Sequence, residues 1–396
     1  MTSIRAVRNL AGLLLLSVVA AGAAAQSVSR ATFVQLERVQ ELMTEENYAE
    51  ARTLLEAHVV KIQKNSYDFA LTSQYLAHVS VLMGDAARAR LALEAALAKE
   101  DLPDELRTDM SLFYGTVLMS EEEFDLARQA LEAWFAVAPL PQPNQIFTLA
   151  YANYMSGNVP RAEELVDRAI GDSTDPQESW YQLHYRTLFE QQKYERAEEV
   201  LLGMLDRAPS NPMYWRMLAG HYLHLERSTE GLASLMVAYV NGLIDSDTDL
   251  SQIVALWGFI DAPEKGARML KALIDEGRVE SNAESLKRLG NLWLMARERN
   301  DALEALTRAA ELEPDGKTYE LVGGIYFEEE NWDSAYDAYQ NAMRQGDLED
   351  PRRVSLLAGI SAYRAGDYGN ARTALREAAK DVKLKPQADS ILREIN

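Results

Sequence analysis

The sequence predicts an all-α protein, a right-handed α-solenoid of about ten helical hairpins closed by a C-terminal capping helix. Small residues recur along the chain at intervals of 33 to 38 residues. A period of this length is typical of stacked hairpins, each of which buries its apolar face against its neighbours. An aromatic or aliphatic residue often stands three positions earlier, preceded by a Gly-Asp or Gly-Asn turn. The recurring small residues are Ala51, Ala89, Ala127, Ala162, Ala197, Gly231, Ala267, Ala302, Ala335 and Ala371.

A second set of small residues marks the first helix of each hairpin, upstream of the turn. Two helices can approach closely only where small side chains separate them, so these positions indicate packing and not chemistry. Prolines close several of the repeats, because proline disfavours continuation of a helix. The first-helix set is Gly115, Ala150, Ala219, Gly290, Gly323 and Gly359, and the closing prolines are Pro139, Pro209 and Pro314.

The hairpins are expected to follow one another from about Thr32 to Lys380. This leaves little room for a second domain, so residues 26–396 are predicted to form a single superhelix. The clearest hairpin begins at Pro212, which follows Asn211. Proline fits at the first position of a helix, where its missing N–H would have had no intrahelical partner.

Two stretches interrupt the regular period. Residues 139–143 read Pro-Leu-Pro-Gln-Pro, and residues 244–250 form a polar link between the sixth and seventh hairpins. The superhelix is expected to bend near these two stretches. After the last hairpin, Pro386 to Asn396 is predicted to form the capping helix that covers the final apolar face.

The first 25 residues have the features of a secretory signal peptide. Arg5 and Arg8 precede an apolar run from Leu10 to Ala21, and residues 23–25 supply a small-x-small cleavage site. Such a run is too short to favour a membrane span. The chain has no cysteine, so it offers no lipid-modified cysteine, disulfide or thiolate ligand. We expect a mature protein in the periplasm of a Gram-negative bacterium.

The charge of the chain limits its partners. The formal net charge is −21, and loss of the two arginines in residues 1–25 would bring it to −23. Nucleic acids and anionic lipids are bound through clustered Lys and Arg, which the sequence lacks. Neither is therefore expected as a partner, and a basic protein fits better.

The sequence contains no recognisable catalytic motif. It lacks a nucleophile elbow, a phosphate-binding glycine-rich loop and an H-E-x-x-H zinc motif, so no catalytic, cofactor-binding or metal-binding residue is expected. His221 and His224, with His184, could suggest zinc, but the favoured interpretation is that at least one of the pair His221 and His224 packs on the neighbouring helix. The runs Glu121–Glu123 and Glu328–Glu330 fall at turns, where carboxylates stay solvated.

A protein-binding groove is predicted along the first helices of the central hairpins. Aromatic and Arg side chains, the usual anchors of protein interfaces, fall there outside the packing positions. A groove of this kind would accept an extended peptide or a partner helix. The competing interpretation is that several of these side chains fill the core between repeats. The candidate residues are Phe147, Tyr151, Tyr154, Gln182, Arg186, Phe189 and Arg216.

The repeat resembles the tetratricopeptide repeat. The stretches Ser179–Ile244 and from Ala267 onward are similar to the periplasmic tetratricopeptide proteins associated with TonB systems of gammaproteobacteria. The resemblance implies a non-enzymatic scaffold or accessory role beside TonB, ExbB and ExbD, which energise outer-membrane iron uptake. The alternatives are an adaptor for envelope assembly or polysaccharide export, and an accessory of a cell-wall hydrolase.

Overall fold

The computed structural model describes residues 28–62 and 67–395, and these contain 21 α-helices and no strand. Twenty of the helices pair into ten consecutive hairpins, and the last helix stands alone at the C-terminal end. The predicted α-solenoid of ten hairpins with a capping helix is thereby confirmed. The proposed signal peptide, residues 1–25, lies outside the described residues. No helix in the described part of the chain is long and apolar enough to cross a membrane.

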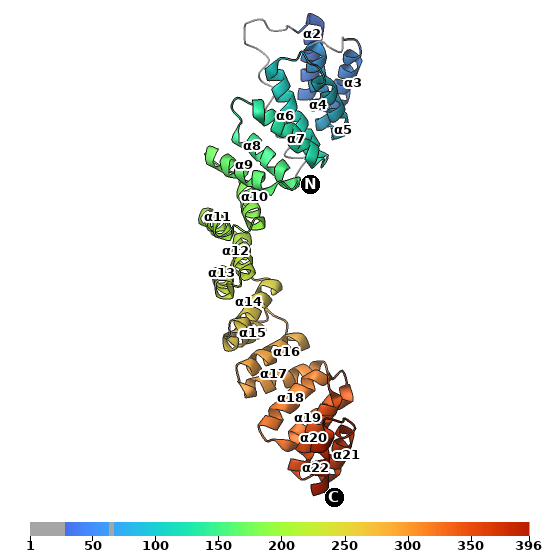
Figure 1. The fold of residues 1–396 in the computed structure, drawn as a ribbon, viewed down its shortest axis with the longest axis vertical. Coiled ribbons are helices and arrows are strands. Elements are labelled where there is room, and N and C mark those ends of the chain that lie inside the picture. Colours follow the sequence, from blue (N-terminus) through green and yellow to red (C-terminus); the bar gives the residue numbers. More distant parts are fainter. Residues whose placement is uncertain (1–27, 63–66, 396) are drawn as a thin grey trace. The chain divides into compact units, whose positions relative to one another are not determined.

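The chain divides into two compact units, Met1–Asp206 and Arg207–Asn396. The first unit contains five hairpins, which follow one another in chain order (Figure 1). Their helices are α2 (Arg30–Thr44), α3 (Tyr48–Val59), α4 (Tyr67–Leu82), α5 (Ala86–Leu97), α6 (Asp104–Ser120), α7 (Phe124–Val137), α8 (Pro143–Met155), α9 (Val159–Asp172), α10 (Glu178–Glu190) and α11 (Tyr194–Arg207).

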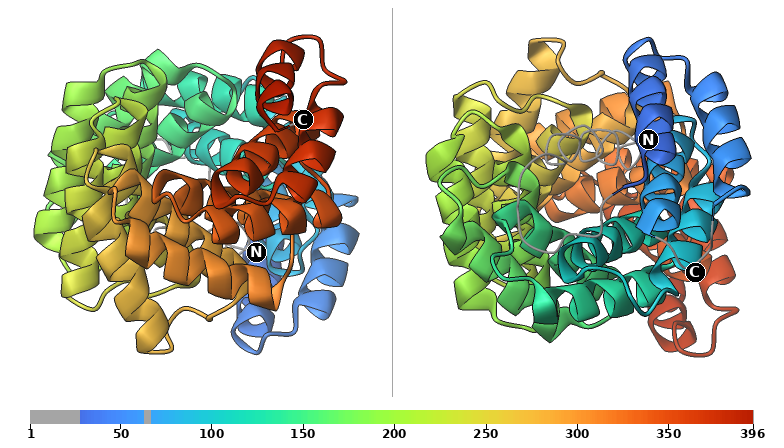
Figure 2. Two further views of the ribbon diagram at one scale, coloured as in Figure 1. Left: turned by 90° about the horizontal axis from the view of Figure 1, so that it is seen from below. Right: turned by 90° about the horizontal axis from the view of Figure 1, so that it is seen from above.

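The second unit contains the other five hairpins and the C-terminal helix. Further views show the hairpins of each unit lying side by side in chain order (Figure 2). The helices are α12 (Pro212–His224), α13 (Ser228–Val240), α14 (Asp247–Phe259), α15 (Pro263–Asp275), α16 (Ala283–Met295), α17 (Arg299–Leu312), α18 (Gly316–Glu328), α19 (Trp332–Gln345), α20 (Pro351–Ala365), α21 (Tyr368–Ala378) and α22 (Lys385–Glu394).

The irregular stretches and the capping helix lie close to where the sequence indicated. Residues 247–250, predicted as part of the polar link, instead form the first turn of α14, because the Ser246 hydroxyl accepts the Asp249 N–H and caps the helix there. Residues 138–142 connect α7 to α8, and residues 241–246 connect α13 to α14; the bends expected there remain predictions. Helix α22 packs on α20 and α21. The Tyr363 hydroxyl donates to Glu394, and the Arg372 guanidinium donates to the carbonyl of Ile395.

The predicted small residues lie buried on the second helices, with one error of register. In nine hairpins the predicted residue is the fourth residue of its helix, as Ala302 is in α17. In the seventh hairpin that place belongs to Gly266, so assigning Ala267 to it was wrong. A Cβ on Gly266 would lie 3.0 Å from the Val254 carbonyl oxygen of the facing helix. Ala267 is also fully buried, and the sequence could not separate two adjacent small residues.

In several hairpins the residue four positions after the small residue of the second helix packs against the first helix at a glycine, where that helix has no side chain. A Cβ on Gly115 would lie 2.5 Å from Leu131 Cγ, and a Cβ on Gly290 would lie 2.5 Å from Leu306 Cγ. Real Cβ atoms do not approach other carbons so closely, because interiors are already close-packed. The first-helix glycines are therefore required by contact within the hairpin.

All ten hairpin turns share one backbone conformation. Seven of these turns place a residue other than glycine at positive φ, while Gly84, Gly157 and Gly366 serve the other three. At each turn the next N–H reaches back to the carbonyl five residues earlier, as from Glu123 to Leu118 at 3.0 Å. This is the Schellman arrangement, which satisfies carbonyls at the end of the first helix.

Replacement of Gly115 by alanine tests the close contact within the third hairpin. The added methyl group collides with Leu131, so we expect a loss of about 1–3 kcal/mol of stability, typical of an overpacked core. The matched control is Gly203→Ala in α11, where nothing lies within 4 Å of the new Cβ. The control should gain about 0.5–1 kcal/mol, since alanine favours a helix over glycine. Denaturant unfolding followed by circular dichroism measures both; equal effects would contradict the contact.

Glycine at a strained turn position should stabilise the chain. Glu122 has φ of +61° and is exposed, and an L-residue there costs about 1–2 kcal/mol relative to its preferred regions. We therefore expect Glu122→Gly to raise the melting temperature. Glu123→Gly is the control, because Glu123 has φ of −82°, where glycine brings only entropy loss. A lower melting temperature for Glu122→Gly than for Glu123→Gly would contradict this account.

Candidate protein-binding surface

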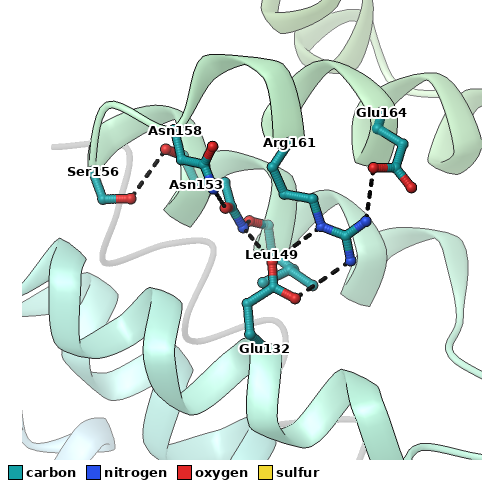
Figure 3. A network of polar contacts seen from close by, with 7 residues as sticks. All are labelled: Glu132, Leu149, Asn153, Ser156, Asn158, Arg161 and Glu164. Atoms are coloured by element: carbon teal, nitrogen blue, oxygen red, sulfur yellow. Dashed lines mark hydrogen bonds and ion pairs between the residues drawn. The ribbon is translucent and has the colours of Figure 1, made fainter.

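A buried polar network fixes the fourth hairpin on the third (Figure 3). The side-chain amide of Asn153 on α8 is fully buried and donates to Glu132 on α7 at 3.1 Å. Arg161 on α9 donates to the same carboxylate at 3.2 Å, and Asn158 donates to the Asn153 side-chain oxygen at 2.8 Å. Because every buried group in it has a partner, the network specifies the position of α8 against its neighbour.

A second network fixes the fifth hairpin on the fourth. The carboxylate of Glu163 on α9 accepts hydrogen bonds from Lys193, from Gln191 at 2.7 Å and from Arg196 at 2.7 Å. Burial alone would raise the pKa of Glu163, but the hydrogen bonds from Lys193 and Gln191 outweigh burial and lower it. The carboxylate therefore stays charged, and α10 is held in place beside α8.

The apolar part of the predicted groove begins as an aromatic stack on α8 and α10. The ring of Phe147 stacks on Trp180 of α10 with centroids 5.3 Å apart, and on Tyr151 at 6.4 Å. Trp180 is buried, whereas Tyr151 is 41% exposed. Phe147 therefore belongs partly to the core between repeats, whereas the Tyr151 ring is accessible to solvent.

The polar part lies one turn further along the same helices. The Tyr154 hydroxyl donates to Glu190 of α10 at 2.5 Å. Burial and the contact with Glu190 raise the pKa of Tyr154, while neighbouring Arg186 opposes the rise. Arg186 is exposed, and Gln182 donates to Glu178 within α10 at 3.0 Å. Phe147, Tyr151, Tyr154, Gln182 and Arg186 thus lie along the paired first helices α8 and α10.

The other two predicted residues have packing partners of their own. Phe189 meets Tyr194 edge-on at 5.4 Å, within the fifth hairpin. Arg216, in the second unit, donates through two nitrogens to Asp249, each at 2.8 Å. This pair joins α12 to α14 across neighbouring hairpins. Binding by any of the seven residues remains a prediction.

The second unit holds a groove that the sequence reading did not select. A cavity of about 490 Å³ lies over the first helices α16, α18 and α20. Its apolar lining includes Leu294, Leu321 and Leu357, and the ion pair of Arg299 with Glu328, at 2.8 Å, stands on its rim. The sequence contains one signal for this groove, the adjacent glycines Gly323 and Gly324, because they leave part of the surface of α18 without side chains.

Of the three histidines considered as an alternative metal site, His184 and His221 are buried, whereas His224 is exposed. His221 is 1% exposed, and its ring meets Tyr222 edge-on at 6.0 Å. His184 is also buried, and burial lowers its pKa despite the carboxylate of Asp167 at 3.7 Å. Across residues 28–62 and 67–395, no group of three or more His, Cys, Asp or Glu side chains is placed to hold a metal ion.

Parts of the chain are similar to several solved structures at low sequence identity. No curated protein matches the chain. Among solved structures it is similar to YrrB, described as a TPR protein with an unusual peptide-binding site, with 17% identity over 50% of this chain and 98% of that one, TM-score 0.37. MamA of Desulfovibrio magneticus RS-1 shows 18% identity over 44% and 96%, TM-score 0.36. The C-terminal part of a TPR protein from Cytophaga hutchinsonii shows 17% over 70% and 95%, TM-score 0.38.

The family match is more specific than these structural likenesses. Residues 184–242 and 323–389 match the model described as tetratricopeptide repeat. The first segment runs from α10 to the end of α13, and the second from α18 to α22. The hairpins of these segments are therefore tetratricopeptide repeats, in agreement with the repeat that the sequence resembles.

Removal of the Arg216 side chain tests whether this residue holds neighbouring hairpins together. Asp249 is only 4% exposed, so Arg216→Ala leaves a buried carboxylate supported mainly by Ser246. Because Arg216 itself is half-exposed, we expect a loss of about 1–3 kcal/mol, below that of a fully buried pair. Arg268→Ala, which breaks an exposed pair with Glu264, should change stability by less than about 0.5 kcal/mol. An unchanged midpoint for Arg216→Ala would contradict this structural role of Arg216.

Proposed function

We propose that this protein is a non-enzymatic scaffold that binds a protein partner along the first helices of its hairpins. The observation that supports the proposal most directly is the face of α8 and α10. Two buried polar networks hold these helices in register, yet Tyr151 and Arg186 remain exposed on them. A rigid surface that presents an aromatic ring and a guanidinium suits protein recognition, because little conformational entropy is lost on binding.

We further propose that the partner belongs to a TonB–ExbB–ExbD energy-transduction complex in the periplasm, which serves outer-membrane iron uptake. Two features of the sequence support this assignment, the secretory character of residues 1–25 and the resemblance to periplasmic proteins of TonB systems. The formal charge of −21 favours a basic partner segment. Electrostatic attraction of that kind raises association rates and weakens as salt screens it.

Site-specific photo-crosslinking tests this proposal. A benzoylphenylalanine replaces Tyr151 in the full-length tagged protein, expressed in iron-starved cells of the source bacterium. The matched control replaces Leu202, which is 46% exposed on the second helix α11. We expect crosslinks to TonB, ExbB or ExbD from position 151 and none from position 202, because the partner would lie on the first-helix face.

Other outcomes discriminate among the alternatives. Crosslinks from position 151 to export or envelope-assembly proteins would keep the scaffold and reject the TonB assignment. Equal crosslinking from both positions would reject the α8 and α10 face as the binding surface.

A further inference from the structure

Tyr339 stands at a position of the repeat that is leucine in most hairpins. The residue four places after the small residue packs between the two helices of each hairpin. In the ninth hairpin this residue is Tyr339, and in the fourth it is Val166. The other eight hairpins place leucine there, at Leu55, Leu93, Leu131, Leu201, Leu235, Leu270, Leu306 and Leu375. Tyrosine therefore adds a hydroxyl at a position that leucine normally fills.

Two adjacent glycines on α18, Gly323 and Gly324, leave room for the Tyr339 ring to extend from α19 past that helix. A Cβ on Gly323 would lie 2.7 Å from Tyr339 Cδ1, so the ring occupies the space of that missing side chain. At Gly324 the nearest atom to an ideal Cβ is the Tyr339 hydroxyl oxygen, at 4.0 Å. The ring thus starts on α19 and carries its hydroxyl to the side of α18 that lines the cavity.

The Tyr339 hydroxyl has no hydrogen-bond partner within residues 28–62 and 67–395, whereas Tyr154 and Tyr363 each donate to a glutamate. Tyr339 is 2% exposed, and burial raises its pKa to about 12, with smaller effects of Arg353 and Glu320. The hydroxyl is therefore a protonated donor. Its oxygen is not among the fully buried unpaired polar atoms of the described residues, so it reaches the cavity, where a carbonyl oxygen of a ligand can replace water as its acceptor.

The cavity around this hydroxyl has an apolar floor and a rim without net charge. Leu321 and Leu357 form the floor beside Gly324, and Leu321 is 38% exposed. Arg353 pairs with Glu320, and Arg299 pairs with Glu328. The charged lining comprises three cations, Arg299, Lys317 and Arg353, and three carboxylates, Glu320, Glu328 and Glu349. The lining therefore carries no net charge, and an uncharged ligand fits it better than a charged one.

We propose that this cavity binds an uncharged, extended segment of a protein partner, with Tyr339 donating a hydrogen bond to a carbonyl oxygen of that segment. The absence of a side chain at Gly324 lets a peptide backbone approach the hydroxyl. An apolar side chain of the segment packs on Leu321 and Leu357, and the volume lies within the range of small-ligand sites. This inference rests on the proposed scaffold function and adds a chemical class of partner and a contact residue.

Peptides selected on the intact protein provide the probe. A phage-displayed library of random 12-residue peptides is panned against the chain without residues 1–25, and a selected peptide is titrated by fluorescence anisotropy. Tyr339→Phe keeps the packed ring and removes only the hydroxyl, so we expect about fivefold weaker binding with no fall in melting temperature. Tyr336→Phe, on the same helix but outside the cavity, is the matched control and should bind as the parent does.

A second variant keeps the test independent of any effect on folding. Gly324→Ala places a methyl group 4.0 Å from the hydroxyl, an ordinary contact that the fold accepts, yet it covers the donor. We expect it to weaken the same peptide at least fivefold. Peptides that bind all variants equally would overturn the role of Tyr339 and leave the scaffold function standing. A library that yields no binding peptide would contradict the assignment of the cavity as a peptide site. The crosslinks at position 151 test the scaffold function separately.

Discussion

The close approach of two helices at a small residue is the contact on which the rest of the structure depends. In most hairpins the first helix presents alanine or glycine where the second presents a bulky buried side chain, as at Gly115 and Leu131. Because this requirement recurs along the chain with the repeat, the sequence is periodic although no catalytic motif recurs in it. A hairpin alone cannot cover its remaining apolar faces, so stacking follows from the same constraint.

Departures from that constraint are where individual repeats differ from one another. The ninth hairpin accepts a tyrosine instead of leucine because Gly323 leaves room for the ring. In the fifth hairpin the first helix instead carries Tyr185 at the place that alanine or glycine occupies in most others, while the second helix keeps the leucine, Leu201. Burial raises the pKa of Tyr185 to about 12. The first-helix side of each repeat can therefore be specialised without disturbing the stack.

The periodic elements could be predicted from the sequence because their cause is local. The small residues and turns predicted ten hairpins and a capping helix. The one register error, at Gly266, arose because two small residues are adjacent there. The candidate site was harder, since its side chains meet partners about one repeat away. Nothing near Arg216 in the sequence shows that it pairs with Asp249, or that Phe147 stacks on Trp180. Likewise, nothing in the sequence shows that the Tyr339 ring packs against Gly323 and that its hydroxyl lies near Gly324, in the lining of the cavity.

The spacing of the polar contacts bears directly on which residues remain for a partner. Arg196 bonds to Glu163, Arg216 to Asp249 and Arg353 to Glu320, each over 33 residues, so one repeat regularly supplies the partner for the next. Such pairs hold neighbouring hairpins in register, and a ligand that used them would have to break them. Tyr151 and Tyr339 differ, because neither hydroxyl takes part in these pairs among the described residues: Tyr151 is 41% exposed, and the Tyr339 hydroxyl reaches the cavity beside Gly324. Recognition on the first helices is therefore expected to depend on the residues that the next repeat leaves unpaired.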